Sequence, residues 1–158
     1  MAARKASCSG NLKQLGLALN MYADNYHFSL PVCKPLTSTS KIDGVVVEEN
    51  FIDPSTLVAS TYPTLPEALK PYVGESKVFH CPGETDQYYF KNYGSSYEWN
   101  YFLNGRRVDE KTYRLTPYNM KDPVFMMDAK NFHGKGEKGK NYLYENSTIL
   151  DYVKTEML

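Results

Sequence analysis

The sequence has no excess of charge of either sign. Its 158 residues carry 18 Lys and Arg against 18 Asp and Glu, so the formal net charge is zero. Nucleic-acid binding depends on a basic face that neutralises phosphates, and attraction to an anionic membrane surface needs a similar cluster of cations. The balanced composition supports neither partner, and we expect no nucleic acid to bind.

Long hydrophobic runs are also missing. No stretch approaches the roughly 20 apolar residues that a membrane-spanning helix needs. The first six residues, MAARKA, are small and basic, but the apolar segment of a signal peptide does not follow them. At this length we expect one domain over residues 1–158 with a hydrophobic core of its own.

Tryptophan is scarce whereas tyrosine is abundant, with one Trp against fourteen Tyr. Tyrosine suits half-buried sheet faces and contact surfaces, because its flat apolar ring ends in a hydroxyl that needs water or a partner. A Tyr-rich sheet is the simpler interpretation, and a dedicated binding surface is the alternative.

Residues that commonly bind metals or catalyse reactions are few and lack a recognisable spacing. His27, His80 and His133 form no metal-binding pair, and His80 adjoins Cys81, so in a strand their side chains would point to opposite faces. A nucleophilic Cys81 assisted by His133 and an Asn or Asp is conceivable, because such partners meet in space, but no local signal supports it. Phosphate-binding loops, serine elbows and HExxH motifs are absent from the sequence. We therefore expect no catalytic residue, no cofactor and no metal.

A long helix is indicated over about residues 4–26. Apolar residues recur there at spacings of four and three, which places them on one face of a helix with about 3.6 residues per turn. We expect this face to pack on a sheet, and Pro31 to follow the end of the helix. Gly16, in mid-helix, marks either a close approach of another segment or nothing. The helix seam consists of Cys8, Leu12, Leu15, Leu19, Tyr22 and Tyr26.

The rest of the chain is dominated by short strand-like segments. Residues 32–64 are predicted to be a variable segment, mostly loop, that contains a strand over 42–52 with a turn at Asp43-Gly44. A short helix is predicted to follow over about 65–73. A helix followed by consecutive strands indicates the α+β class, with an antiparallel sheet of three to five strands across about 77–154. Runs rich in aromatic and β-branched residues follow at 77–82, 95–105, 112–120, 123–129 and 140–153.

In this order the segments resemble bacterial pilin-like proteins, namely the type II secretion pseudopilin-like proteins that carry a prepilin-type N-terminal cleavage and methylation domain. ARKASCSGNLKQLGLALNMYADNY looks like the SC-x-x-NLKQ-x-G-L-A segment of that family. ALKPYVGESKVFHCPGE resembles its L-x-PY…VFxCP segment, and SSYEWNYFLNG its SYGYNYFLGG segment. PVFMMDAKNFHG and NYLYENSTILDYV correspond to its DA…H and NYLFADGHV segments. The similarity extends over nearly the whole chain.

The resemblance implies a pilin-like fold, in which a long helix packs on a small antiparallel sheet. It also implies that this chain lacks the apolar N-terminal half of that helix. It also implies a non-enzymatic structural subunit of a type II secretion pseudopilus or type IV pilus-like filament, with other pilin-like subunits as partners. Such a subunit is anchored in the inner membrane by the missing segment, and its globular domain lies in the periplasm or outside the cell. Leu17 and Met21, roughly 160–200° from the centre of the seam, are the candidate subunit contacts. An envelope binding module with a Tyr-rich face for a polysaccharide or protein is the alternative.

Three cysteines in an exported domain suggest one disulfide with a free thiol, or no disulfide at all. The resemblance favours the pair Cys8–Cys81, and Cys33–Cys81 is the alternative. Known major pseudopilins bind calcium in a carboxylate-rich loop near the C-terminus. In this chain the corresponding carboxylates are too scattered for such a loop, so we expect no calcium. These carboxylates are Glu137, Glu145, Asp151 and Glu156.

The C-terminal hairpin departs from the pattern of the family. A Gly- and Lys-rich insert, GKGEKGK at 134–140, follows His133, and Asn146-Ser147 stands where the family has Asp-Gly. Since asparagine tolerates positive φ, we still expect a turn at this point.

Overall fold

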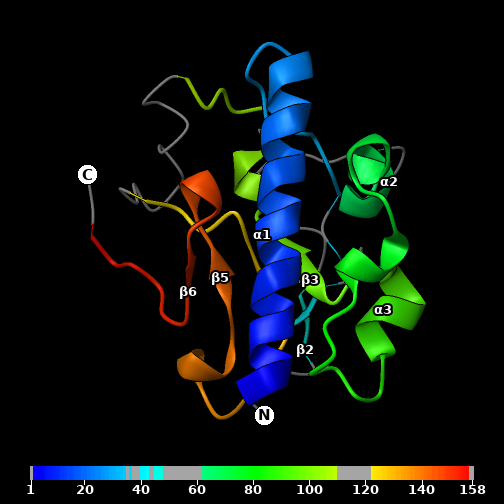
Figure 1. Cartoon of the computed structure of the whole chain (residues 1–158), viewed down its shortest axis with the longest axis vertical. Coiled ribbons are helices and arrows are strands. Elements are labelled where there is room, and N and C mark those ends of the chain that lie inside the picture. The colour runs from blue at the N-terminus through cyan, green and yellow to red at the C-terminus, as the bar shows by residue number, and fades with distance from the viewer. Residues whose placement is uncertain are drawn as a thin grey trace.

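The longest element, α1 (Ala2–Asn25), lies across one face of a small antiparallel sheet (Figure 1). The computed structural model describes residues 2–34, 36, 40–42, 45–47, 62–109 and 122–156. The sheet has the order β3-β4-β5-β6, which is also the order of its strands along the chain. The described part of the chain is thus α+β, as the order of segments predicts. The other helices are α2 (Leu65–Leu69) and α3 (Tyr88–Tyr93), and the strands of this sheet are β3 (Tyr97–Trp99), β4 (Met126–Asp128), β5 (Tyr142–Leu143) and β6 (Ile149–Leu150).

A separate hairpin occupies the predicted strand region within 32–64. Strands β1 (Ser40–Ile42) and β2 (Val45–Val47) pair antiparallel, with Ile42 opposite Val45. The predicted turn residues Asp43 and Gly44 lie between them, outside the described residues.

The buried face of α1 supplies a large part of the core. Cys8, Leu12 and Leu15 are fully buried, and Leu19 is almost so. The sheet contributes the side chains of Trp99, Met126 and Leu143 to the same cluster, and Leu69 and Phe79 join them from the segments before it. Burial of each such aliphatic side chain is worth about 1.5–3 kcal/mol, so this face holds the helix on the sheet.

The last residue of the predicted seam is an exception. Tyr22 is partly buried against the core, but Tyr26 is 51% exposed. The helix ends at Asn25, and the next turn takes His27 and Phe28 to positive φ. Tyr26 therefore leaves the buried face, and its ring stacks on Tyr22 with 4.2 Å between ring centroids. The expectation that Tyr26 packs on the sheet was wrong.

Gly16 marks a close approach of another segment to α1. A Cβ at this position would lie 2.6 Å from Ser147 Oγ and 3.2 Å from Leu143 Cδ1. Ser147 belongs to the 3₁₀ turn η8 (Glu145–Ser147), where Asn146 and Ser147 both have positive φ. This turn links β5 to β6, and the Tyr144 amide donates to the Thr148 carbonyl at 2.8 Å. The turn predicted at Asn146-Ser147 is present and rests against the helix.

Two predictions between residues 65 and 82 need correction. The helix expected over 65–73 is α2 followed by the 3₁₀ turn η3 (Lys70–Tyr72), since Pro71 lacks the amide that would continue an α-helix. The strand expected at 77–82 is instead the 3₁₀ turn η4 (Ser76–Phe79) with an extended end. Adjacent Val78 and Phe79 are both buried, and a strand would send them to opposite faces.

Other 3₁₀ turns are η5 (Tyr101–Leu103), within the predicted run 95–105, and η7 (Glu137–Gly139), within the insert. Helix α3 was not predicted. The predicted strand at 112–120 lies outside the described residues.

Candidate functional site

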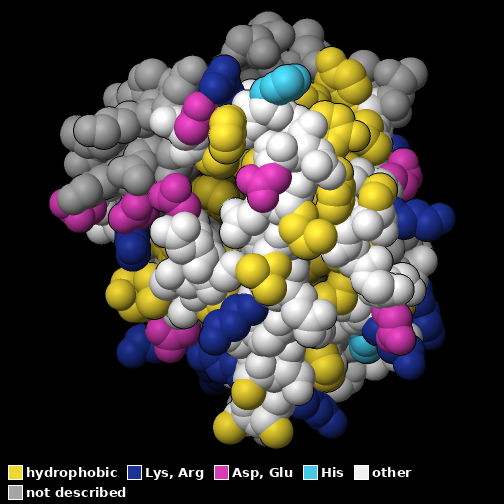
Figure 2. Space-filling model, turned by 45° about the horizontal axis from the view of Figure 1, so that its top comes forward, with side chains coloured by type: hydrophobic (Ala, Val, Ile, Leu, Met, Phe, Trp, Pro, Cys, Tyr) yellow, Lys and Arg dark blue, Asp and Glu magenta, His cyan; other side chains and the backbone are white. Residues whose placement is uncertain are grey.

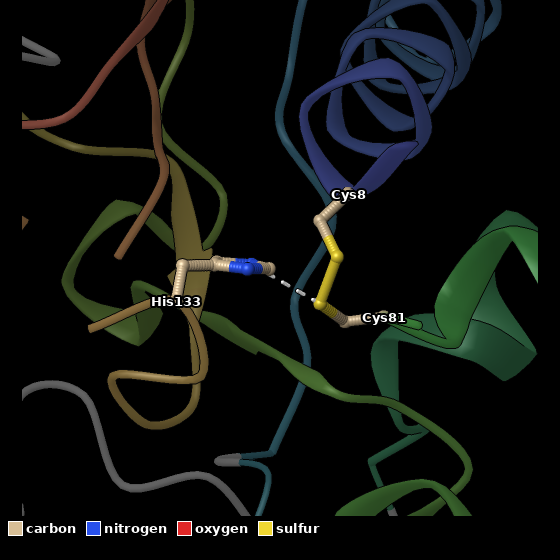
Figure 3. A group of neighbouring side chains, drawn as sticks. All are labelled: Cys8, Cys81 and His133. Atoms are coloured by element: carbon tan, nitrogen blue, oxygen red, sulfur yellow. Dashed lines mark hydrogen bonds between the residues drawn. A yellow bond between two sulfur atoms is a disulfide. The ribbon is translucent and has the colours of Figure 1, made fainter. Parts of the chain in front are cut away.

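A disulfide joins Cys8 of α1 to Cys81, just after η4 (Figure 3). The two residues are 73 positions apart in sequence, and both are fully buried. This is the pair that the resemblance favours, and Cys33 remains a free, buried cysteine. The bridge fixes the first turns of α1 to the segment that leads into α3 and the sheet.

Cys81 is held in place by a buried network around Glu84. The Cys81 amide donates to Ser96 Oγ at 3.0 Å, and the Ser96 hydroxyl donates to Glu84 Oε1 at 2.8 Å. Glu84 is 2% exposed, and its carboxylate also accepts hydrogen bonds from the backbone amides of Tyr89 and Phe90 in the first turn of α3. A buried carboxylate is costly unless its oxygens are hydrogen-bonded, and these donors meet that need.

On the other side of the disulfide lies His133, whose ring points at the sulfur atoms in Figure 3. Its Nε2 is 3.3 Å from Cys81 Sγ and 3.4 Å from Asp128 Oδ2. The side chains of His133 and Asp128 are 1% and 0% exposed. The structure thus gathers a disulfide, an imidazole and a carboxylate in a water-excluded cluster, and the imidazole and carboxylate form an ion pair only when His133 is protonated.

Asp128 faces inward because of the alternation along β4. Met126 and Asp128 are buried and Met127 between them is less so, as expected for a strand with one face on a core. Asp128 pairs in register with Tyr97 of β3, and its Oδ2 accepts a hydrogen bond from the backbone N–H of Asn141 at 2.8 Å. Its other oxygen, Oδ1, is buried and has no hydrogen-bond partner within the part of the chain that the structure describes.

The Gly- and Lys-rich insert holds His133 in the cluster. The His133 amide donates to the Gly139 carbonyl at 3.0 Å, closing a tight loop in which Gly136 has φ of 67°. The imidazole also needs Gly83, because a Cβ there would lie 2.5 Å from His133 Cε1. The insert that departs from the family pattern is therefore the element that places the imidazole.

The chemistry open to Cys81 is set by its bond to Cys8. The sequence suggested Cys81 with His133 and an Asn or Asp as a conceivable nucleophilic set, and the structure does bring Cys81, His133 and Asp128 together. In the disulfide, however, Cys81 has no thiol that a base can activate. His80 lies outside the cluster, with its ring against Phe90. Asp128 was missed, although its inward place in PVFMMDA follows from strand alternation.

The candidate subunit contacts lie on the outer face of α1. Leu17 is 57% and Met21 50% exposed. Figure 2 shows hydrophobic side chains, interspersed with polar and charged ones, over this side of the molecule. Further exposed hydrophobic residues include Phe28 and Val32, beyond the C-terminal end of the helix. The outer face is thus mixed in character, with two large apolar side chains one turn apart.

Tyrosines are divided between the core and the surface. Tyr97, Tyr142 and Tyr144 are buried in or beside the sheet. Tyr88 and Tyr89 of α3 meet edge to face with 5.3 Å between centroids, and Tyr88 is 48% exposed. The sheet and a surface cluster on α3 therefore both contribute to the tyrosine bias.

A pocket of about 330 Å³ lies between α1 and the segment 72–78. Asn11 and Gln14 line its helix side, and Glu75 and Lys77 add charges of opposite sign. Tyr72 is the one tyrosine among its described lining residues, whereas a cleft lined by several tyrosines would favour a binding module.

The C-terminal carboxylates considered as calcium ligands make contacts with other groups of the protein. Glu137 Oε1 accepts the Val153 amide, and an Asp151 oxygen lies 3.5 Å from Lys5 Nζ. Glu145 and Glu156 are engaged in contacts as well. That no calcium binds stays a prediction.

Within the described residues, no helix combines the length and apolar character needed to cross a bilayer.

Comparison with known proteins places the chain in a family. No curated protein and no solved structure matches it. A family model described as "Protein of unknown function (DUF1559)" matches residues 1–135, which is most of the chain. This family is associated with prepilin- and pseudopilin-like proteins, which supports a pilin-like relation at a coarse level. The chain belongs to the DUF1559 family.

Proposed function

We propose that this chain is the globular part of a non-enzymatic, pilin-like subunit of an envelope filament, either a type II secretion pseudopilus or a type IV pilus-like fibre. In this proposal the fold is pilin-like, the subunit is anchored in the inner membrane, and its globular domain lies in the periplasm or outside the cell. Its partners are further pilin-like subunits, of the same or of a different kind.

The observation that supports the proposal best is the two-sided character of α1. One face is fixed to the protein by the Cys8–Cys81 disulfide and by buried leucines such as Leu12 and Leu15. The opposite face leaves Leu17 and Met21 about half exposed. A helix that must transmit contacts from subunit to subunit needs a rigid attachment to its own domain and an accessible outer face. The coarse family relation points in the same direction.

Cysteine cross-linking in cells tests this proposal. The protein is expressed from its natural gene with Leu17→Cys and Met21→Cys together in a Cys33→Ala background, so that each chain carries two free thiols, both of them introduced. We expect a ladder of cross-linked species after mild oxidation, because neighbouring helices in a fibre bring these positions together. Lys70→Cys with Lys91→Cys, at exposed sites on η3 and α3, is the matched control. The same random smear from both double variants, or monomer alone, would contradict the proposal.

The second candidate function, an envelope binding module, has one observation in its favour. Tyr88, Tyr89 and Tyr93 of α3 form a surface cluster, and Lys130 Nζ lies 5.9 Å from the centroid of the Tyr89 ring. Exposed aromatic rings with polar groups beside them can stack on sugar rings or pack on a protein surface. Titration of the protein with cell-wall polysaccharides, compared with Tyr88→Ala, tests this candidate. Saturable binding that Tyr88→Ala weakens would favour it, and no binding would leave the filament subunit as the better account.

A further inference from the structure

We propose that the buried cluster of Cys8, Cys81, His133 and Asp128 is a site for a divalent transition metal, with Zn²⁺ as the best match, when its disulfide is reduced. Disulfide and metal are then alternative ways of fixing α1 to the sheet. This inference concerns the core of the domain and does not depend on the proposed filament function.

The donor atoms are already gathered. Single donor atoms of Cys8, Cys81 and His133 all lie within 4.8 Å of one another. Among the residues that the structure describes, they are the one group of three His, Cys, Asp or Glu side chains found in such an arrangement. Zinc sites have bond lengths of about 2.0–2.3 Å, so donors around one ion lie roughly 3–4 Å apart. Once the disulfide is reduced, only small side-chain movements are needed to bring the two sulfur atoms and the imidazole nitrogen to these distances.

A fourth donor stands next to the imidazole. Asp128 Oδ2 is 3.4 Å from His133 Nε2, and no described residue hydrogen-bonds to the buried Oδ1 of the same carboxylate. An unpartnered buried carboxylate oxygen costs free energy, which a bound cation would recover. Asp128 would act as a direct ligand through one oxygen, because its carboxylate lies beside Nε2, the ring nitrogen of His133 that faces the sulfur atoms.

The kind of donor selects the metal. Two thiolates, an imidazole and a carboxylate oxygen suit tetrahedral Zn²⁺, whereas calcium and magnesium prefer sites made of oxygen atoms alone. Two thiolates and one carboxylate also offset the 2+ charge in a site from which water is excluded, which a neutral donor set would not do.

Opening the disulfide requires a reductant supplied from outside the protein. A dithiol or a phosphine gives two electrons to the Cys8–Cys81 bond, and with two protons this yields two thiols. Zn²⁺ binding then displaces both thiol protons to solvent, because the thiolate is the metal-binding form. In a reducing compartment disulfides do not persist, so the metal would hold α1 in place there.

Metal loading during refolding tests the site, since a fully buried cluster is reached most easily before the chain closes. The full chain carrying Cys33→Ala is unfolded, reduced with a phosphine, and refolded without oxygen in the presence of Co²⁺. We expect about one Co²⁺ per chain, with thiolate-to-cobalt charge-transfer bands and the intense d–d absorption of a tetrahedral ion. Zn²⁺ should displace the cobalt and remove both features.

Matched variants assign the ligands. His133→Gln should weaken cobalt binding by about 100-fold or more, and Asp128→Asn by about 10- to 100-fold. His27→Gln, at an exposed position, should bind cobalt as the parent does. Far-UV circular dichroism shows whether each variant has folded, and Asp128→Asn serves as the second test if His133→Gln does not fold.

Several results would overturn the inference. One is a reduced parent chain that folds but gives no thiolate-to-cobalt band or an octahedral spectrum, and another is a reduced chain that no metal can fold. Equal binding by the oxidised chain, or by both His133→Gln and Asp128→Asn, would show that cobalt binds elsewhere. Tetrahedral cobalt that depends on reduction and on His133 supports the site.

Discussion

At the scale of single residues, two buried carboxylates differ in how completely their oxygens are hydrogen-bonded. Glu84 is surrounded by donors from Ser96 and the first turn of α3, whereas Oδ1 of Asp128 has no hydrogen-bond partner among the described residues. The first arrangement is the ordinary way to bury a carboxylate. The second leaves one hydrogen-bonding site unfilled, and for this reason we place a ligand site there.

Cys33 should be unreactive in the native protein. Burial, followed by the nearby charge of Glu67, raises the pKa of the Cys33 thiol to about 12, so it stays protonated at neutral pH. We expect iodoacetamide at pH 8 to leave the native protein unmodified, and to alkylate one cysteine per chain in denaturant without reductant. Peptide mapping by mass spectrometry should locate the label at Cys33. A label on Cys8 or Cys81 would contradict the disulfide described here.

Glu98 of β3 should make stability depend on pH. Desolvation raises its pKa and outweighs the opposing attraction of Lys140. An acid whose pKa is raised in the folded state favours folding at low pH, and this contribution is lost as pH rises through the raised pKa. Glu98→Gln should therefore be more stable than the parent at pH 7, with the difference shrinking below the ordinary glutamate range. Urea unfolding at pH 4 and pH 7 measures this, with the exposed Glu75→Gln as control. A difference that grows toward pH 4 would show the sign to be wrong.

At the scale of elements, α1 is the feature that local sequence determines best. Its 3.6-residue periodicity predicts the buried face from Cys8 to Tyr22. The buried face of a regular helix can be predicted from its own sequence, without information on the rest of the fold. Tyr26 was misplaced because the chain leaves the helix at Asn25 through residues with positive φ, which nothing in the sequence of His27 and Phe28 demands.

Two glycines in α1 give a matched pair of substitutions. A Cβ at Gly10 would meet nothing within 4 Å, whereas a Cβ at Gly16 would meet Ser147 Oγ at 2.6 Å. Gly10→Ala should raise the free energy of unfolding by about 1 kcal/mol through helix propensity alone. Gly16→Ala gains the same propensity but presses on the side chains of Ser147 and Leu143, at a cost of about 1–3 kcal/mol for overpacking. Urea denaturation should thus show Gly16→Ala to be less stable than Gly10→Ala by about 1–3 kcal/mol, and equal stabilisation would mean that η8 does not rest on α1.

The contacts between elements were harder to predict. Asp128 meets His133 because β4 places the aspartate inward and a Gly- and Lys-rich loop folds back through Gly139, an arrangement that depends on sheet register. The 3₁₀ turn η4 replaced a predicted strand because two adjacent apolar residues, Val78 and Phe79, had to reach the same core. The strand propensity of a segment does not predict which core its side chains will contact in the folded protein.

At the scale of the whole molecule, the Cys8–Cys81 bridge and the buried leucines tie a long helix to a small sheet while its outer face stays accessible. In the chain-entropy model a loop of this length contributes about 4 kcal/mol, which matters for a sheet whose strands are only two or three residues long. The domain is thus built to hold one helix rigidly, and we regard the exposed Leu17 and Met21 as its means of contact with neighbouring subunits.

The most direct test of this account measures filament assembly when the outer face is changed. Cells expressing the natural gene with Leu17→Lys and Met21→Lys are sheared, and the polymer is collected by sedimentation and quantified by immunoblot. We expect at least a tenfold loss of polymer relative to the parent, while the free energy of unfolding of the domain changes by no more than about 0.5 kcal/mol, as for exposed sites generally. Undiminished polymer from this double variant, with the domain still folded, would contradict the claim that the outer face of α1 joins one subunit to the next.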